Sequence, residues 1–202
     1  PSEQSLADVV GAKDYERVAR LAADLGIPEV AIARLEPWAA ALVLTQFALS
    51  KTGFDAQLGI EMQITERAST DGKPIEGLES VIYQLSVFDS RSFDEQTRFL
   101  LDSADDAAHL GDDLGRLIDA WRSADLRALE KEFLKERARS PALYDALLGA
   151  RNRKWMPKIE ALFDEDQDYL VVVGTLHYVG KDGLLNLLKK RGFRPVPLPA
   201  AN

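Results

Sequence analysis

The chain has 202 residues, which is enough for one large domain or two small ones. Its content of 46% hydrophobic and 29% charged residues excludes an intrinsically disordered protein and indicates a folded, globular one. A net charge of −8 disfavours non-specific binding to nucleic acid, and the absence of cysteine excludes disulfides, thiolate catalysis and cysteine-bound zinc.

The first part of the chain predicts a run of helices. Ser5 and Asp8 have the spacing of a capping box, and the periodic apolar residues that follow them indicate a helix. Two further helices are expected to begin at Pro28 and Pro37, because proline suits the first helical turn. The second of these contains the most apolar stretch of the chain, residues 37–49, which is too short to span a bilayer.

The middle of the chain predicts one strand among further helices. After a helix over residues 59–72, the proline and glycine of "KPIEGLES" disfavour a helix, so we expect a strand at about 74–78 with Glu79 at its end. Ser80 is expected to cap the next helix, and Ser92 to open another through a capping box. Two more helices are expected, over residues 112–139 and 141–163.

The end of the chain predicts two more strands. Residues 168–174, "DYLVVVG", are apolar and β-branched, so we expect a strand covered on both faces. A leucine-rich helix ending at Gly192 follows, and the prolines of "FRPVPL" indicate an edge strand. We therefore expect an α/β or α+β fold, mostly helical, with a small central sheet and a large helical insertion at about residues 80–163. Three short strands are few for an independent sheet, so part of the sheet is expected to be missing from residues 1–202, and the family resemblance given below implies that the missing strands of this single domain are N-terminal.

The loop within "VVVGTLHYVGKDG" holds the first candidate for chemistry. It is not a phosphate-binding Walker loop, because five residues separate Gly174 from Gly180 and Asp182 stands where a hydroxyl is needed. Ligands bind at the carboxyl edge of strands in open α/β sheets, and His177 lies there, just beyond Gly174, which allows close approach of the backbone. His177 is therefore a metal ligand, an acid–base group, or a histidine that only hydrogen-bonds the turn.

Three other polar side chains are considered as site residues. The sequence supports one interpretation for His109 and two each for Glu79 and Arg151. His109 lies among carboxylates on a predicted helix, which indicates a solvated surface position. Glu79 could join His177 in a metal site with oxygen and nitrogen ligands, or it could pair with an arginine or a helix amide. Arg151 could bind a carboxylate bidentately, with Glu79 as a partner, or it could be solvated while Trp155 packs inward.

Several motifs, taken together, resemble the TraB/GumN family over nearly the whole chain. The features are a Gly-x-x-His motif, a Gly-Leu-Glu with a glutamine five residues after the glutamate, and an Arg-Asn-x-x-Trp. In this sequence they are Gly174 and His177; Gly77, Leu78, Glu79 and Gln84; and Arg151, Asn152 and Trp155. That family resembles the Tiki metalloproteases and is grouped with the erythromycin-esterase-like and ChaN-like folds.

The resemblance implies a metal-dependent hydrolase of the protease type, with manganese, cobalt or zinc as its divalent cofactor. It implies that His177 and Glu79 are catalytic and bind the metal, and that Arg151, Gly174 and Gln84 contact the substrate. A metal-bound water would then be the nucleophile. The family carries two Gly-x-x-His motifs and this sequence has the second, so the first third of the family's length is expected to be missing, which favours a chain that is inactive by itself.

A second function class stays open beside the hydrolase. A non-enzymatic binding protein for a peptide, a pheromone-like ligand or a saccharide in the bacterial envelope is favoured by the lack of a second motif histidine. The exposed edges of an incomplete sheet also predict a homodimer. The residues do not determine the compartment, and the resemblance points to the periplasm or the envelope.

Overall fold

The computed structural model describes residues 4–198 and the side-chain environment of all of these but Ala56, His109, Gly111, Asp112, Asp113 and Glu136. By packing, the chain divides into two compact units. The first comprises Pro1–Glu76 and Ser80–Leu114, and the second comprises Gly77–Glu79 and Gly115–Asn202. Glu79 therefore belongs to the same unit as His177, although almost a hundred residues of sequence separate them.

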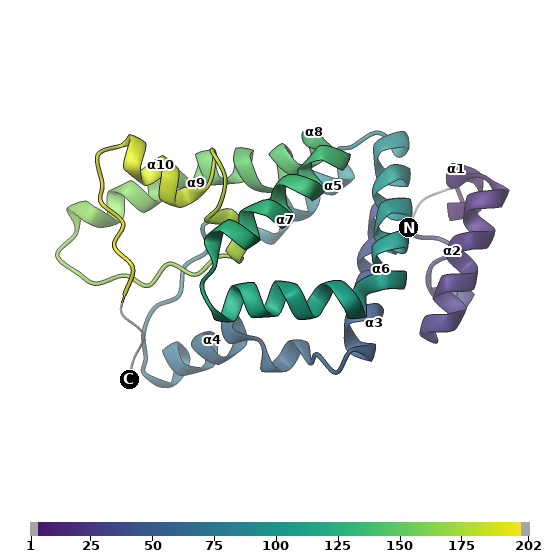
Figure 1. The fold of residues 1–202 in the computed structure, drawn as a ribbon, viewed down its shortest axis with the longest axis horizontal. Coiled ribbons are helices and arrows are strands. Elements are labelled where there is room, and N and C mark those ends of the chain that lie inside the picture. Colours follow the sequence, from purple (N-terminus) through teal and green to yellow (C-terminus); the bar gives the residue numbers. More distant parts are fainter. Residues whose placement is uncertain (1–3, 199–202) are drawn as a thin grey trace. The chain divides into compact units, whose positions relative to one another are not determined.

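The first unit is helical, as Figure 1 shows. The helices are α1 (Leu6–Val10), α2 (Ala12–Leu25), α3 (Pro37–Lys51), α4 (Ile60–Thr70), α5 (Val81–Asp89) and the first part of α6 (Phe93–Arg122), with 3-10 turns at Glu29–Ala31 and Ala56–Leu58. The predicted caps are confirmed: Ser5 and Ser92 each form a capping box, and the hydroxyl of Ser80 accepts from the backbone N–H of Tyr83. The helix expected from Pro28 is only the first of these 3-10 turns.

The core of the first unit forms where α1, α2 and α3 pack together with part of α6. Small residues let these helices approach closely, and branched residues fill the space between them. The buried members are Leu6, Val10, Val18, Ala22, Ile27, Ile32, Ala40, Ala41, Leu44, Leu100 and Ala104. The helix predicted to begin at Pro37 is confirmed as α3, and its apolar stretch lies in the core of this unit.

The second unit contains the remainder of α6 and a series of shorter helices. They are α7 (Leu126–Arg139), α8 (Pro141–Tyr144), a π-helical turn (Asp145–Gly149), α9 (Ala150–Ala161), 3-10 turns at Leu162–Asp164 and Thr175–His177, and α10 (Leu184–Lys190). The single helix predicted over 112–139 is interrupted after Arg122, where Ala124 adopts a positive φ of 52°. The helix predicted over 141–163 is divided by the π-helical turn.

Two apolar clusters support the second unit. One consists of Trp155, Met156 and Ile159 of α9 and Leu184 of α10, and the other of Leu129, Phe133 and Val179. Tyr178 packs against the first cluster and Leu176 against the second, so the residues on either side of His177 are held by different clusters. This packing fixes the turn that carries the histidine.

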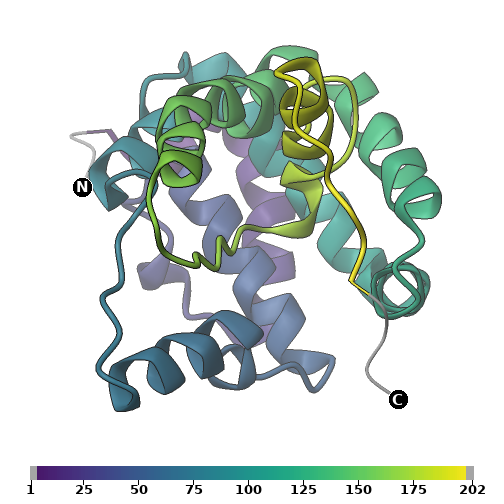
Figure 2. The same cartoon turned by 90° about the vertical axis from the view of Figure 1, so that its left-hand side faces the viewer.

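The predicted central sheet is wrong for the described part of the chain, residues 4–198, which contains no strand. Figure 2 shows the segments between α9 and α10 and after α10 as irregular traces. At 168–174, Val171 and Val173 pack against the cluster of α9 and α10, whereas Leu170 is 76% and Val172 38% exposed. The segment is therefore covered on one side only, and no neighbouring strand supplies hydrogen-bond partners to its backbone.

The two other predicted strands are wrong for related reasons. Residues 74–77 are exposed and lead into the Gly77–Glu79 segment, which is fixed by side-chain contacts and not by a strand ladder. In the last segment, Phe193 stacks on Phe163 at a centroid distance of 4.3 Å, and Pro195 and Pro197 have no backbone N–H to donate. In these segments an extended preference exists without a partner strand.

Among the described helices, none combines the length and the apolar character that crossing a bilayer requires. The expectation of a single, incomplete domain with an insertion at about 80–163 stays a prediction, because a division by packing does not show which parts fold together.

Candidate functional site

His177 closes a single 3-10 turn that begins directly after Gly174. Its backbone N–H donates to the carbonyl oxygen of Gly174 at 2.9 Å. The histidine is 6% exposed, so its ring lies inside the second unit. An added Cβ at Gly174 would lie 3.8 Å from Cδ2 of His177, which is ordinary van der Waals contact. The close backbone approach predicted at Gly174 is therefore not what this structure requires of that position.

Asn152 of α9 holds both the ring of His177 and the loop that follows it. Its Oδ1 lies 2.6 Å from Nδ1 of the imidazole. Its Nδ2 donates to the carbonyl oxygen of His177 at 3.0 Å and to that of Asp182 at 2.8 Å. Asn152 is 1% exposed, and a buried amide is tolerated only when it is hydrogen-bonded, as this one is three times.

The ring of Trp155 covers the imidazole, with 4.5 Å between the two centroids. The pKa of His177 is lowered to about 4, mainly by burial, because a charged imidazolium would lose its hydration. The nearby Arg151 cation contributes to this lowering, and the Glu79 carboxylate acts in the opposite direction. His177 is therefore neutral at physiological pH.

Glu79 and Arg151 form a largely buried, bidentate ion pair. Nε of Arg151 donates to both carboxylate oxygens, at 3.0 and 3.2 Å, and Nη2 donates to Oε1 at 2.7 Å. Nε1 of Trp155 donates to Oε2 at 2.9 Å. The two charged side chains are 9% and 11% exposed. The pairing of Glu79 with an arginine, one of the two interpretations from sequence, is confirmed.

This ion pair competes with the metal site expected from His177 and Glu79. Both oxygens of Glu79 already accept hydrogen bonds from Arg151 and Trp155, so neither is free for a cation without breaking the pair. Within the described residues no three side chains of His, Asp or Glu lie close enough together to hold a metal ion. The described residues fit one nitrogen ligand, Nε2 of His177, and not a complete site.

The loop from His177 to α10 is built around close contacts of its backbone. An added Cβ at Gly183 would lie 2.5 Å from the carbonyl oxygen of Tyr178, so the loop requires glycine at this position. Asn186 of α10 donates from Nδ2 to the carbonyl oxygen of Gly180 at 2.7 Å. Two asparagines, Asn152 and Asn186, thus fix different carbonyl groups of the same loop.

Two other residues considered from sequence, Gln84 and His109, belong to the first unit and not to the unit that holds His177. Gln84 lies on α5 in the first unit, and its side chain is exposed. The side chain of His109 lies outside the described part of the structure. Sequence reasoning missed the contact of Asn152 with His177, although Asn152 was part of the Arg-Asn-x-x-Trp motif. The available signal was an asparagine in the middle of a predicted helix, where its intrinsic preference is poor.

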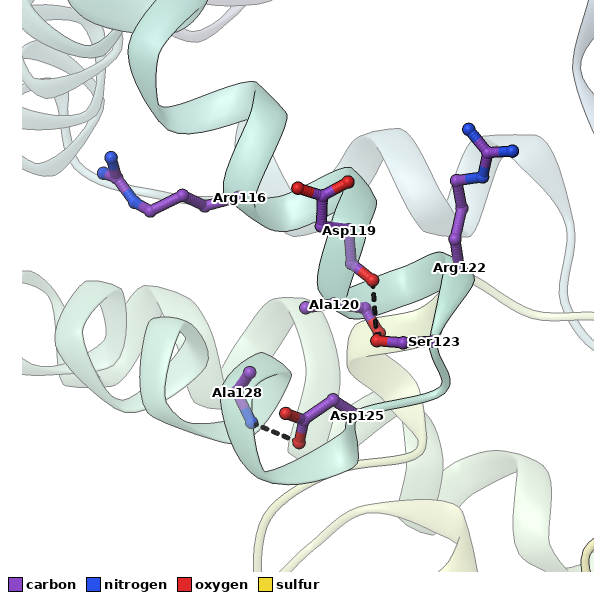
Figure 3. Close-up of a pocket in the computed structure, with 7 residues that line it drawn as sticks. All are labelled: Arg116, Asp119, Ala120, Arg122, Ser123, Asp125 and Ala128. Atoms are coloured by element: carbon purple, nitrogen blue, oxygen red, sulfur yellow. Dashed lines mark hydrogen bonds between the residues drawn. The ribbon is translucent and has the colours of Figure 1, made fainter.

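A surface hollow at the junction of α6 and α7 lies elsewhere in the second unit (Figure 3). Its polar groups serve the ends of these helices: Ser123 donates to the carbonyl oxygen of Asp119, and the carboxylate of Asp125 accepts from the backbone N–H of Ala128. None of the residues that line it belongs to the group formed by His177, Asn152, Trp155, Arg151 and Glu79. That group is the candidate site, because its polar atoms are largely buried and converge.

Comparison with known proteins gives a family and two relatives. A family model described as the TraB/PrgY/gumN family matches residues 1–197. The chain is 25% identical over 191 residues to "Uncharacterized protein YbaP" of Escherichia coli (strain K12), which covers 94% of this chain and 70% of that protein. The protein of the same description from Shigella flexneri gives the same values. No solved structure matches significantly.

Proposed function

This chain belongs to the TraB/PrgY/gumN family, and from that premise we propose that it is a hydrolase in which His177 supplies the working imidazole. The observation that supports the proposal is the state of the ring. His177 is buried and neutral, it is hydrogen-bonded at Nδ1, and Nε2 has no hydrogen-bond partner among the described residues. A ring held in this way presents one nitrogen lone pair in a fixed direction.

The pKa of His177 distinguishes between two roles for Nε2, that of a general acid–base and that of a metal ligand. A general acid–base works best when its pKa lies near the operating pH, and a pKa of about 4 is far below neutrality. A metal ligand, in contrast, must be the neutral imidazole. The low pKa therefore favours a ligand role for His177 and disfavours an acid–base role.

A divalent cofactor (manganese, cobalt or zinc) is the corresponding proposal for the cation. His177 would be its ligand from the described residues, and the other ligands would have to come from outside them. Glu79, held by Arg151 and Trp155, suits a supporting role better than direct ligation. Contacts of Arg151, Gly174 and Gln84 with a substrate stay predictions.

The test is a comparison of the two histidines of the chain. We expect His177→Ala to abolish manganese- or cobalt-stimulated cleavage of peptides by the full chain, and His109→Ala to leave that activity in place. Titration calorimetry with the same ions measures binding directly, and His177→Ala should weaken it. Unchanged stimulated activity in His177→Ala would overturn the assignment of the site.

The alternative is a non-enzymatic binding protein for a peptide, a pheromone-like ligand or a saccharide. The observation that favours it is that the described residues bring no metal-binding cluster together. Titration calorimetry distinguishes the hydrolase from the binding protein, because a binding protein of this kind would not bind manganese, cobalt or zinc. In that outcome the buried ion pair and His177 would serve to shape the binding surface.

The extended segment at residues 166–173 supports a second copy of this chain as the partner, in a homodimer. Residues 166–173 make no backbone–backbone hydrogen bond within the described part of the chain, and Leu170 is largely exposed. An unpaired, apolar, extended segment is a template for pairing with another chain. Light scattering at micromolar concentration tests this, and a monomeric mass would contradict it.

A further inference from the structure

We propose that Asn152 is a positioning residue that selects the Nδ1–H tautomer of His177 and thereby directs the lone pair of Nε2 away from the helix. The hydrogen bonds and burial of Asn152 and His177 carry this inference. It rests on the proposed function only in its consequence for metal binding. The tautomer itself is a property of the folded chain.

The orientation of the Asn152 amide is determined by its two backbone partners. The same amide group approaches the carbonyl oxygens of His177 and Asp182, at 3.0 and 2.8 Å, and a carbonyl oxygen only accepts. The atom facing both carbonyls must therefore be the NH₂ nitrogen, whose two protons satisfy them. The opposite orientation would place an amide oxygen against two other oxygens in a buried site, which is strongly unfavourable.

The orientation of the amide then determines the proton on the ring. Oδ1 of Asn152 lies 2.6 Å from Nδ1 of His177, and an amide oxygen is an acceptor only. Nδ1 must therefore carry the proton and donate it. In a neutral imidazole only one nitrogen is protonated, so Nε2 keeps its lone pair.

The helix supplies a second contact that keeps the ring in place. Asn152 and Trp155 are three residues apart on α9, so their side chains lie on the same face of the helix. Asn152 binds the edge of the imidazole, and the ring of Trp155 lies against it at a tilt of 39°, with 4.5 Å between the two centroids. The ring can neither rotate nor exchange its tautomer without leaving the buried amide oxygen of Asn152 unpaired, which costs about 1–3 kcal/mol.

The direct test is nuclear magnetic resonance of the metal-free full chain. Long-range ¹H–¹⁵N correlation spectra at neutral pH distinguish a protonated from an unprotonated ring nitrogen, and His109→Ala removes the second histidine from the spectrum. We expect Nδ1 to be protonated and Nε2 unprotonated in the protein with Asn152 intact. A dominant Nε2–H tautomer in that protein overturns the proposal, whether or not any variant folds.

Variants then separate tautomer selection from simple support of the loop. Asn152→Leu keeps the volume of the side chain and removes the acceptor, and we expect it to shift His177 to a mixture of tautomers or to Nε2–H. Asn186→Leu is the matched control, because Asn186 also donates to a carbonyl of this loop but does not contact the ring. If both variants, or neither, change the tautomer, Asn152 has no specific positioning role.

Metal affinity is measured in a separate experiment from the tautomer. Loss of the residue that orients a metal-binding histidine typically weakens metal affinity about 10–100-fold, and we expect that range for Asn152→Leu with zinc as the probe. If the spectra show the expected tautomer but the unmodified chain binds no metal, the proposed function fails and the positioning role of Asn152 stands. If metal binds and Asn152→Leu leaves the affinity and the tautomer unchanged, the positioning role fails alone.

Discussion

At the scale of single residues, burial of His177 couples folding to pH. The pKa of His177 is about 4 in the folded protein and about 6.5 in an unfolded chain, so below pH 6.5 protons bind the unfolded state preferentially. The stabilisation by neutral His177 is therefore complete above about pH 6.5 and is lost as the pH falls towards 4. Between about pH 7.5 and about pH 5 the loss amounts to about 2 kcal/mol.

We expect this loss to appear as a difference between two proteins, because other groups titrate in the same range. The free energy of unfolding, measured by urea denaturation without metal, should fall about 2 kcal/mol more in the wild type than in His177→Gln over that interval. Glutamine retains a polar side chain of similar size and does not titrate. Parallel pH profiles for the two proteins would show that His177 does not titrate in the way its burial implies.

The Glu79–Arg151 pair predicts a second residue-scale effect. Removing one member of a buried ion pair leaves the other charge without its partner, so we expect Arg151→Met to destabilise the protein by about 3–5 kcal/mol. Combining it with Glu79→Gln should recover part of the loss, which a double-mutant cycle of unfolding free energies measures. The exposed pair of Arg20 and Glu16, both 72% exposed, is the control, with an expected coupling of about 0.5 kcal/mol or less.

Sequence and structure agree on some residues of the site and not on others. The pairing of Glu79 and Arg151 could be anticipated, because a carboxylate and a guanidinium that are both partly enclosed by apolar residues need each other. The role of Asn152 could not, because it depends on carbonyl groups 25 and 30 residues further along the chain. Nothing in the residues next to an asparagine records such distant partners.

At the scale of elements, the helix ends that carry a clear local signal followed from sequence, whereas the break after Arg122 and the π-helical turn at Asp145–Gly149 did not. Capping boxes at Ser5 and Ser92, the left-handed Gly26 at the end of α2, and Pro37 at the start of α3 are local signals that act within one turn. The strands did not follow, because β-branched residues at 168–174 encode an extended backbone, whereas a sheet also needs a neighbouring strand. That neighbour is absent from the described residues, and the extended preference persists without it.

The loop between His177 and α10 gives a prediction at the same scale. We expect Gly183→Ala to lower the unfolding free energy by about 1–3 kcal/mol, because the new methyl group would overlap the carbonyl oxygens of Tyr178 and Val179. Gly174→Ala is the matched control, since its methyl group would meet only the ring of His177 at 3.8 Å. Equal thermal stability of the two variants would mean that the loop can relax around Gly183.

At the scale of the whole molecule, the question is whether the second unit needs a β-sheet in order to hold its candidate site together. The chain is matched by the family model over residues 1–197, yet the described residues form helices and unpaired extended segments. As far as it is described, the second unit has two apolar clusters and a hydrogen-bonded polar site without any sheet. The helical parts therefore do not need the extended segments to be paired in order to hold His177 and Asn152 together.

Amide hydrogen exchange shows whether the extended segment pairs in solution. We expect the backbone of residues 168–173 to exchange rapidly in dilute protein, because its N–H groups have no backbone acceptor in the described structure, whereas α9 should be protected. If a homodimer forms through this segment, protection should rise with protein concentration. Leu170→Lys, which places a charge on the exposed side of the segment, should abolish that rise. Strong protection at every concentration would instead mean that the segment is paired within one chain.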